Sequence, residues 1–456
     1  MIILARILNK EQLLSYGDIE VKELLLDLLL KGLEAVDPYK AVKKVISRDN
    51  NSIKVGGKTL RIHGKIYVLG LGKASCSMAK AIEEILGDLI EDGVVVTKYG
   101  YSIPLEKIRV IEAGHPIPDV NSLRAGYESF KLFKRISEDD LLIVLISGGG
   151  SALLVYPVDN ISLEDLIKTN DLLIKSGANI HEINIVRKHI SRIKGGGIVK
   201  LCKGRILSLI VSDVVGDRVE DIASGPTSAD TSSFIDAYKI LKNYGLWDKL
   251  PMSIRKYINK GLSKEAEETL KELPNRVYNV IIASNEIACK TIYKEALRRG
   301  YRAYILTTTL EGEAKDTALA IGSIVQEIYR FNRPFKKPVI LIAGGETTVT
   351  IHGKHGMGGP NQEFALSITR KIAGLRGTAV LAVDTDGTDG PTDAAGGLVD
   401  SYSLDKLNNA GIDIGTVLNK HDTYNALKKI NSLVLTGPTM TNVNSLFIIG
   451  ITSSSQ

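Results

Sequence analysis

Two glycine loops are the first segments of the chain whose residue types suggest chemistry. Gly70-Leu-Gly-Lys-Ala-Ser75 and Ser147-Gly-Gly-Gly-Ser151 each follow a short apolar run. Successive glycine amides can approach an anion closely, and amides at the start of a helix attract phosphate. A plain turn or flexible loop is the alternative interpretation. The predicted anion-binding residues are Lys73, Ser147, Gly148, Gly149, Gly150 and Ser151.

A basic segment, Asn184–Gly197, offers further cations. Arg187, Arg192 and Lys194 recur at roughly helical spacing, and three glycines end the segment. A cationic helix face of this kind suits a carboxylate or a phosphate, so we predict that all three residues contact substrate. The alternative is a basic surface helix that ends at a glycine, where cations are favoured in any case.

Asp213 follows the apolar run at residues 206–211 after one residue, Ser212. In open α/β sheets, ligands bind at the carboxyl ends of strands. A carboxylate placed there can accept a proton from an attacking hydroxyl or hold a metal. We therefore predict a catalytic role for Asp213, with a turn or helix-capping aspartate as the alternative.

The C-terminal half of the chain repeats the pattern of glycines after an apolar run. Gly344–Thr348 and Gly356–Glu363 are glycine-rich, and residues 435–444 form a polar stretch before the last apolar run. These segments predict nucleotide contacts, with a hairpin turn as the alternative. The predicted nucleotide-binding residues are Gly345, Glu346, Thr347, Asn361, Gln362 and Asn444.

An acidic segment, Asp384–Gly396, follows another apolar run. Carboxylate oxygens are the ligands that Mg²⁺ prefers, and we predict that Asp386 and Asp389 bind it. The spacing does not fit an EF-hand, because Thr388 and Ala395 stand where that loop needs ligands. An acidic turn is the alternative.

Apolar runs alternate with segments of helical periodicity along most of the chain, which predicts parallel sheets covered on both faces. The expected fold is α/β, with two doubly wound α/β domains flanking a cleft. The expected division is an N-terminal domain at 1–235, a helical connection at 236–274 and a C-terminal domain at 275–456. Strands are expected at residues 66–70, 93–97, 109–113, 141–146, 206–211, 277–283, 303–307, 339–343, 347–351, 379–383 and 446–449.

Bulk properties exclude several classes of function. The 456 residues carry a net charge of only +6, and the Lys and Arg residues are scattered, which argues against a nucleic-acid partner. Three distant cysteines favour a reduced, cytoplasmic protein. The leucine-rich run at 23–31 is interrupted by Asp27, so it predicts a packed helix and no membrane partner.

In this order, the motifs resemble the class II glycerate kinase family, whose members carry a MOFRL-type C-terminal domain. The resemblance lies in GLGKAS at Gly70, SGGGSAL at Ser147, the basic segment at Asn184 and VSDVVGD at Val211. It continues in AGGETTVTIHGKHGMGGPNQE at Ala343, DTDGTDGPTDAAGG at Asp384 and TGPTMTNVNS at Thr436. It implies a homodimer that uses ATP and Mg²⁺ to phosphorylate D-glycerate, with Lys73 and Asp213 as active-site residues.

Two positions depart from the family pattern. Pro360 and Ser445 stand where many members have Arg and Asp. A cationic phosphate contact is therefore missing at position 360 or is supplied by Lys354 or His355.

Together these observations lead to a hypothesis for the reaction. Asp213 accepts the proton of the glycerate 2-hydroxyl, while Lys73 and Arg192 hold the carboxylate or the γ-phosphoryl group. Asp386 and Asp389 hold Mg²⁺ and ATP, with Glu346 assisting.

The alternatives are a glycerate 3-kinase or related sugar-acid kinase, a non-catalytic sensor of phosphorylated sugars, and an NAD(P)H-dependent hydroxypyruvate reductase. Against the reductase, Ser75 stands where a dinucleotide fingerprint needs its third glycine.

Overall fold

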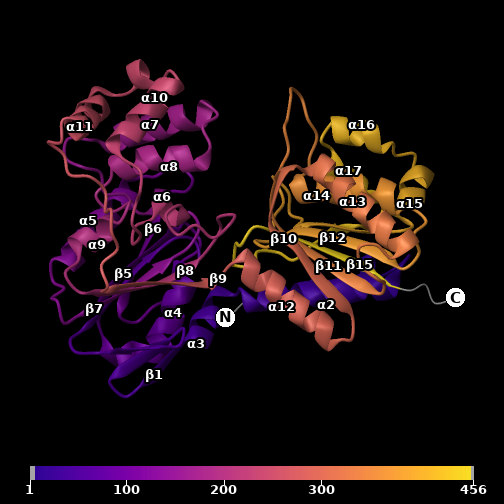
Figure 1. Cartoon of the computed structure of the whole chain (residues 1–456), viewed down its shortest axis with the longest axis horizontal. Helices are drawn as coiled ribbons and strands as arrows, with labels where there is room; N and C mark the ends of the chain where they lie inside the picture. The colour runs from indigo at the N-terminus through magenta and orange to yellow at the C-terminus, as the bar shows by residue number, and fades with distance from the viewer. Residues whose placement is uncertain (1–5, 453–456) are drawn as a thin grey trace. The chain divides into compact units, whose positions relative to one another are not determined.

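The computed structural model describes residues 6–452, which form two compact units (Figure 1). One unit, called here the continuous unit, is the single stretch Pro38–Ile282. The other, called the split unit, combines residues 6–37 with residues 283–452. Each unit has its own central sheet and is described by itself.

The sheet of the continuous unit has the strand order β6-β5-β4-β7-β8-β9. The five strands from β6 to β8 pair in parallel, so their carboxyl ends share one edge of the sheet. All residues of β4 and β7 are buried, as expected for apolar strands covered on both faces. The strands are β4 (Ile66–Leu71), β5 (Ile90–Lys98), β6 (Ile108–Ala113), β7 (Leu141–Ile146), β8 (Arg205–Val211) and β9 (Val277–Ala283).

A second layer of the continuous unit is helical. Helices α7, α8, α10 and α11 pack on one another around buried side chains that include Leu173, Val186, Phe234 and Ile254. These helices lie together at the top of Figure 1. The helices of the unit are α3 (Pro38–Val45), α4 (Ser75–Leu86), α5 (Val120–Phe133), α6 (Gly150–Leu153), α7 (Leu163–Lys175), α8 (Ile180–His189), α9 (Gly197–Leu201), α10 (Phe234–Asn243) and α11 (Met252–Leu262).

A small antiparallel sheet completes the continuous unit. It consists of β1 (Ile46–Asp49), β2 (Ser52–Val55) and β3 (Lys58–Arg61). The sequence analysis did not predict these strands, because four residues are too few to show a clear alternation of apolar and polar side chains.

The sheet of the split unit has the strand order β10-β11-β15-β12-β13-β14. β10 and β11 are parallel, whereas the other pairs are antiparallel. The sheet is therefore mixed, and not purely parallel as the strand–helix alternation suggested. The strands are β10 (Arg302–Glu313), β11 (Val339–Thr348), β12 (Thr378–Asp384), β13 (Gly396–Asp400), β14 (Leu433–Val434) and β15 (Ser445–Ile451).

Helices cover both faces of this mixed sheet (Figure 1). α2 and α12 pack on one face, and α13 and α14 pack on the other. The leucine-rich run at 23–31 lies inside α2, where Leu25, Leu26, Leu28 and Leu29 are fully buried. The helices are α1 (Lys10–Leu13), α2 (Ile19–Ala35), α12 (Asn285–Arg298), α13 (Ala314–Phe331), α14 (Pro360–Ile372), α15 (Ser403–Asn409), α16 (Ile414–Asn419) and α17 (Thr423–Lys429).

Two features of the organisation differ from the expected one. Residues 6–37 belong with the C-terminal half, because α2 buries its leucines against β12, β15 and α12. Residues 236–274, expected as a connection, contribute α10 and α11 to the core of the continuous unit. The separate strand expected at 347–351 does not form in the described chain, because β11 continues to Thr348 and the chain then leaves the sheet.

No helix within residues 6–452 has the length and apolar character that crossing a membrane requires.

Candidate active site

Three loops meet at the carboxyl edge of the parallel sheet in the continuous unit. The Lys73 amide donates to the Gly148 carbonyl at 2.9 Å, which joins the loop after β4 to the loop after β7. The Ala74 amide donates to Ser147 Oγ at 3.0 Å. A β-carbon on Gly148 would lie 2.9 Å from Cγ of Asp213, which follows β8. The predicted residues Lys73, Ser147, Gly148 and Asp213 are thus brought together.

The glycines in these loops are required by the backbone. Gly72 and Gly149 have φ values of +124° and +85°, which residues with a β-carbon rarely adopt. At Gly149 a β-carbon would also lie 2.9 Å from His115 Cδ2 and 3.5 Å from Lys73 Cγ. The side chains of His115 and Lys73 thus lie close to the bare backbone of Gly149. The Gly149 amide is at the start of α6, a position suited to an anion.

Asp213 has the electrostatics of a proton acceptor. Burial raises the pKa of its carboxyl above the ordinary value, and the positive charge of Lys73 partly opposes this rise. Within the described chain, Lys73 forms no ion pair within 4 Å, so its ammonium is not neutralised by a direct contact with Asp213. A carboxylate beside an uncompensated cation can accept a proton while the cation holds an anionic substrate.

His115 belongs to the same site, although the sequence analysis did not select it. It follows β6 and lies against Gly149 and near Lys73. Burial, together with the charges of Lys73 and Lys98, lowers the pKa of His115 to about 4, so its imidazole is neutral at pH 7. A neutral imidazole offers one donor and one acceptor. The signal that could have found it is its position directly after an expected strand, as for Asp213.

Lys194 supports the glycine loop from behind. Its buried ammonium donates to the carbonyl of Ser151 at 2.9 Å and to that of Leu154 at 3.4 Å. Burial and the nearby charge of Arg187 lower the pKa of Lys194 to about 7. The structure therefore joins the predicted residues Ser151 and Lys194, with Lys194 contacting the backbone of the loop and of α6.

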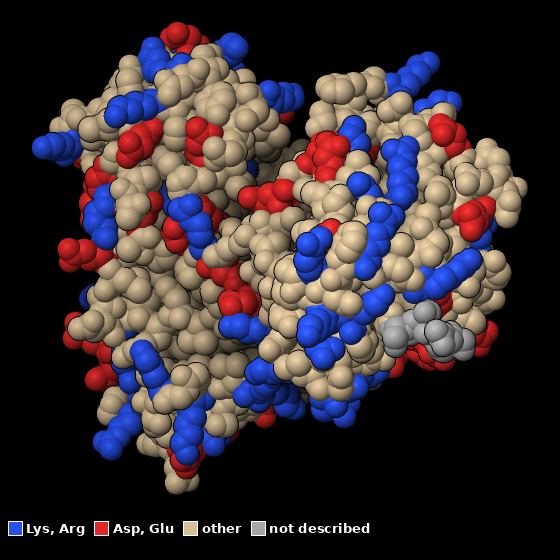
Figure 2. All heavy atoms as spheres, turned by 45° about the vertical axis from the view of Figure 1, so that its right-hand side comes forward, with Lys and Arg blue, Asp and Glu red and all other residues tan. Residues whose placement is uncertain are grey.

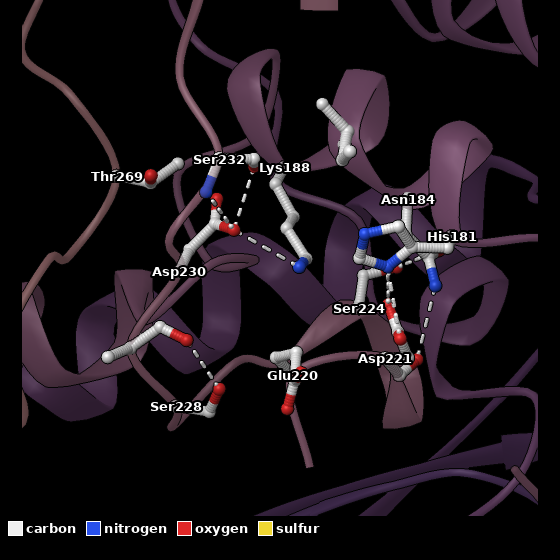
Figure 3. A network of polar contacts seen from close by, with 12 residues as sticks. His181, Asn184, Lys188, Glu220, Asp221, Ser224, Ser228, Asp230, Ser232 and Thr269 are labelled. Atoms are coloured by element: carbon white, nitrogen blue, oxygen red, sulfur yellow. Dashed lines mark hydrogen bonds and ion pairs between the residues drawn. The ribbon is translucent and has the colours of Figure 1, made fainter. Parts of the chain in front are cut away.

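A second polar chain links Ser151 to helix α8, and Figure 3 shows the part of it formed by Ser224, Asn184 and Asp221. Ser151 Oγ lies 2.7 Å from Ser224 Oγ, and Ser224 Oγ donates to Asn184 Oδ1 at 2.9 Å. Asn184 also donates to the carbonyl of Asp221 at 3.3 Å. Ser224 and Asn184 are fully buried, so this chain gives the loop a rigid support.

The two predicted arginines lie elsewhere. Arg187 donates through Nε to Asn170 Oδ1 at 2.8 Å, and burial lowers the pKa of its guanidinium. Arg192 forms an ion pair of 2.5 Å with Asp159 and lines a cavity that includes neither Lys73 nor Asp213. Their predicted contacts with substrate stay predictions.

In the split unit, the predicted nucleotide and metal residues gather at one edge of the mixed sheet. β15 begins at Ser445, which pairs with Gly345 at the end of the β11 pairing and with Asp384 at the end of β12. Asn361 Nδ2 donates to Ser445 Oγ at 2.9 Å. Asn444 lies next to Ser445 in the left-handed region, with a φ of +65°. The antiparallel direction of β15 is what brings these segments together.

Other predicted residues near this edge differ in exposure. Glu346 is exposed on β11, whereas Thr347 and Gln362 are buried. Gln362 donates through Nε2 to Thr392 Oγ1 at 2.9 Å and to the Asp389 carbonyl at 3.2 Å. Pro360 is the first residue of α14, and Lys354 and His355 are exposed in the segment before it.

The carboxylate of Asp389 caps the first turn of helix α14. Its carboxylate accepts from the amide of Asn361 at 3.0 Å, from the amide of Gln362 at 2.8 Å and from Asn361 Nδ2 at 3.1 Å. Burial raises its pKa to about 6, and these hydrogen bonds oppose the rise. Asp389 therefore acts as the acceptor for orphan amides at the helix start. Its predicted role as a metal ligand is untested.

Asp384 and Asp386 fit a hard cation better. Burial and the negative charge of Asp386 raise the pKa of Asp384 well above its ordinary value, with smaller contributions from Asp389 and Glu346. Carboxylates crowded in this way repel one another, and a divalent cation would relieve the repulsion. Within residues 6–452 no three His, Cys, Asp or Glu side chains are arranged to hold a metal ion by themselves. Two carboxylates suffice for Mg²⁺ when substrate phosphates complete its coordination.

The charged side chains of the molecule are mixed in sign. On the face seen in Figure 2, Lys and Arg are interspersed with Asp and Glu and leave wide uncharged areas. This distribution agrees with the small net charge of +6.

Comparisons with known proteins agree with the motifs. Residues 24–259 match a domain described as a domain of unknown function, DUF4147, and residues 339–445 match the MOFRL family. A Pyrococcus horikoshii protein named glycerate 2-kinase is 57% identical over 95% of this chain and 98% of its own. The solved structure of a glycerate kinase from Thermotoga maritima superposes with a TM-score of 0.85, at 40% identity, over 95% of this chain and 99% of that one.

A relative from Agrobacterium vitis carries a different, provisional name, hydroxypyruvate reductase. It is 38% identical over 95% of this chain and 95% of its own, a lower identity than that of the Pyrococcus protein. The paired DUF4147 and MOFRL domains and the full-length similarity to named glycerate kinases leave one conclusion: the chain belongs to the class II glycerate kinase family.

Proposed function

We propose that this protein transfers the γ-phosphoryl group of ATP to the 2-hydroxyl of D-glycerate and releases 2-phosphoglycerate and ADP. The observation that carries the proposal is the contact of Asp213 with the glycine loop beside Lys73, in a chain 57% identical to a named glycerate 2-kinase. A proton acceptor, a cation and an amide-lined anion site are the parts that phosphorylation of a hydroxy acid needs.

In this proposal Asp213 accepts the proton of the attacking hydroxyl. Burial raises the pKa of the Asp213 carboxyl in the direction of pH 7, and a base works best when its pKa lies near the working pH. Lys73 holds the substrate carboxylate or the transferring phosphoryl group by charge. His115, neutral at pH 7, is placed to donate a hydrogen bond to the same substrate without adding charge.

The amides of the loop Ser147–Ser151 hold an anionic oxygen. The loop cannot relax easily, because Lys194 fixes the carbonyl of Ser151 and Ser224 fixes its hydroxyl. A rigid set of donors stabilises developing charge without reorganising during the reaction. Arg192 takes no part in this version of the proposal, since it lies in a separate cavity.

The split unit binds the nucleotide and the metal in this proposal. Asp384 and Asp386 hold Mg²⁺, which neutralises charge on the phosphates when bound. Gly345, Glu346 and Thr347 on β11, with Asn361 and Asn444 beside β15, contact the nucleotide. The charge repulsion between Asp384 and Asp386 is the support for the metal, and the gathering of these segments at one sheet edge is the support for the nucleotide.

The identity of the phosphorylated product tests this proposal. The full-length protein is incubated with D-glycerate, ATP and Mg²⁺, and phosphorus NMR identifies the phosphate ester formed. We expect a secondary ester, in which the phosphorus couples to one carbon-bound proton. A primary ester would replace the proposal with a glycerate 3-kinase, and no ester with any hydroxy acid tested would contradict kinase activity altogether.

A parallel reaction tests the reductase alternative. The protein is incubated with hydroxypyruvate and NADH or NADPH, and absorbance is followed. We expect no oxidation, because Ser75 fills the position of the third fingerprint glycine and its Oγ donates to the carbonyls of Gly72 and Val96. Steady oxidation of either cofactor would favour the reductase.

Two further expectations, a homodimer and a cytoplasmic location, come from the family resemblance and the cysteine content. Light scattering on the purified full-length protein tests the first, and fractionation of the source cells tests the second.

A further inference from the structure

A cavity of about 650 Å³ lies within the continuous unit, apart from the candidate active site. Its walls come from the end of α8, the turn 191–197, helix α9, helix α11 and the segments 158–160 and 265–269. Lys73, His115, Asp213 and the loop Ser147–Ser151 do not line it. Its volume lies within the range of about 300–1,000 Å³ that is usual for small-molecule sites.

The inner walls of this cavity carry cations. Lys188 and Lys194 are 1% and 7% exposed, and His189 is 2% exposed. Lys188 is held by Asp230 at 3.3 Å, as Figure 3 shows, and Lys194 by backbone carbonyls. These contacts fix the inner groups in place, but Asp230 balances the charge of Lys188, and burial lowers the pKa of Lys194 to about 7. The cations available to a ligand are therefore those of the outer walls.

The outer walls carry Arg192 and Lys200, whose carboxylate partners are exposed to water, and Glu265 and Glu268 also line the cavity. Arg192 pairs with Asp159 at 2.5 Å, and the Asp159 side chain is 82% exposed. Lys200 pairs with Glu267 at 2.8 Å, and the Glu267 side chain is 81% exposed. Ion pairs with solvated carboxylates are weak, so a ligand can take the place of the carboxylate at little cost.

Two further groups on helix α11 lack partners in the described chain. The exposed Lys260 forms no ion pair, and the hydroxyl of the half-buried Tyr257 forms no hydrogen bond. The Tyr257 ring packs on Phe234 with centroids 5.9 Å apart, which fixes the direction of its hydroxyl. A half-buried ring whose hydroxyl has no partner within residues 6–452, near the charge of Arg192, is an arrangement that a polar ligand can complete.

We propose that this cavity is a second binding site of the protein, for a small organic or inorganic polyanion with at least two negative charges. Arg192 offers a planar fork for one phosphate or carboxylate group, and Lys200 and Lys260 offer point charges for another. Tyr257 donates a hydrogen bond. The cavity shares only Lys194 with the candidate active site, where Lys194 supports the glycine loop and does not contact substrate, so the proposal does not depend on the proposed function.

Binding of pyrophosphate and of citrate to the full-length protein tests the proposal by calorimetry. The two probes distinguish a phosphate ligand from a carboxylate ligand, and acetate serves as a monoanion control. We expect at least one probe to bind, and acetate to bind more weakly. Lys260→Gln should weaken binding at this site by about fivefold or more, since it removes an unpaired charge.

Matched variants separate this site from the other one. Lys256→Gln removes the same charge from an exposed position on α11 outside the cavity and should leave binding unchanged. Lys73→Gln should also leave this binding unchanged. Tyr257→Phe removes only the hydroxyl and should weaken binding without loss of the fold, which circular dichroism checks.

Three results would overturn the proposal. One is the absence of binding by either probe. The second is equal binding by the wild type, Lys260→Gln and Tyr257→Phe. The third is loss of all binding in Lys73→Gln, which would assign the probes to the candidate active site.

Discussion

The carboxylate of Asp213 packs directly against the backbone of Gly148, so closely that a β-carbon there would lie 2.9 Å from Asp213 Cγ. Asp213, in the loop after β8, thus requires a residue without a β-carbon at position 148, in the loop after β7. The contact joins the loops that follow two neighbouring parallel strands, β7 and β8.

Gly148→Ala should therefore reduce kcat strongly. The new methyl group must displace either the Asp213 carboxylate or the anion-binding loop, and a displacement of about 1 Å can cost about 10²-fold in rate. Steady-state kinetics measures the loss. Gly87→Ala is the control, because no atom lies within 4 Å of its added β-carbon. Equal activity of the two variants would show that the contact has no role in the reaction.

Asp213→Asn should lower kcat by about 10²–10⁴-fold, the usual contribution of a general base, and change KM for glycerate little. Asp248→Asn, at a side chain that is 86% exposed, is the control. Near-normal turnover of Asp213→Asn would remove Asp213 from the role of base.

The same variant should be more stable than the wild type at neutral pH. Burial raises the pKa of Asp213 in the folded chain, so the unfolded chain binds fewer protons between the two pKa values and wild-type stability falls as the pH rises through them. Asparagine does not titrate. The excess in Tm should vanish below a pH of about 3.9, the ordinary pKa of aspartate. An excess that does not change with pH would contradict the assignment.

The acid limb of kcat/KM against pH should move when Lys73 is changed. The positive charge of Lys73 lowers the pKa of Asp213, so Lys73→Gln should shift the limb of the residual activity to higher pH. Lys98→Gln, which removes a charge that acts on His115, should leave the limb in place. A limb that does not move in Lys73→Gln would show that another group is the base.

Lys194→Met should change how stability depends on pH. The pKa of Lys194 is about 7 in the folded chain and 10.5 in an ordinary lysine, so the unfolded chain binds more protons between these values. Wild-type stability should therefore rise with pH across that range, by up to about 1.4 kcal/mol per pH unit, and the variant should lack this contribution. Urea unfolding at several pH values measures it. Lys131→Met, at a 71% exposed position, should behave as the wild type.

The carboxylates of the acidic segment should separate into two kinds. Asp386→Asn should raise the Mg²⁺ concentration needed for half-maximal activity by about tenfold or more with little change in Tm, since it removes a charged oxygen ligand. Asp389→Asn should lower stability by about 1–3 kcal/mol, because an amide nitrogen then replaces one of the two oxygens that accept these hydrogen bonds and faces at least one donor. The reverse pattern would make Asp389 the metal ligand.

Much of the fold could be predicted from apolar runs and their spacing. The run expected as a strand at 141–146 is β7, and the run expected at 206–211 lies in β8. The loops at Lys73, Ser147 and Asp213 were placed together correctly, because the carboxyl ends of parallel strands share one edge.

The rest depends on three-dimensional contacts that spacing does not show. The leucine pattern of α2 predicts a helix with an apolar face in any setting. Only the structure shows that this face covers β12 and β15. Asp389 has the residue type and position of a metal ligand, yet the start of α14 occupies both of its oxygens. His115 was not predicted, because its position just after an expected strand was used as a signal for Asp213 but not for a histidine.

The order of strands in the split unit bears on how the protein is made. β15 lies in the middle of its sheet between β11 and β12, and α2 packs on it from a segment some four hundred residues earlier in the chain. The continuous unit lies between these two segments and can fold while synthesis proceeds, whereas the surface that α2 covers is complete only when β15 has been made. A nascent chain released before residue 445 would carry one folded half and one half with an open sheet and a leucine helix that is only partly covered, which is a substrate for chaperones and proteases.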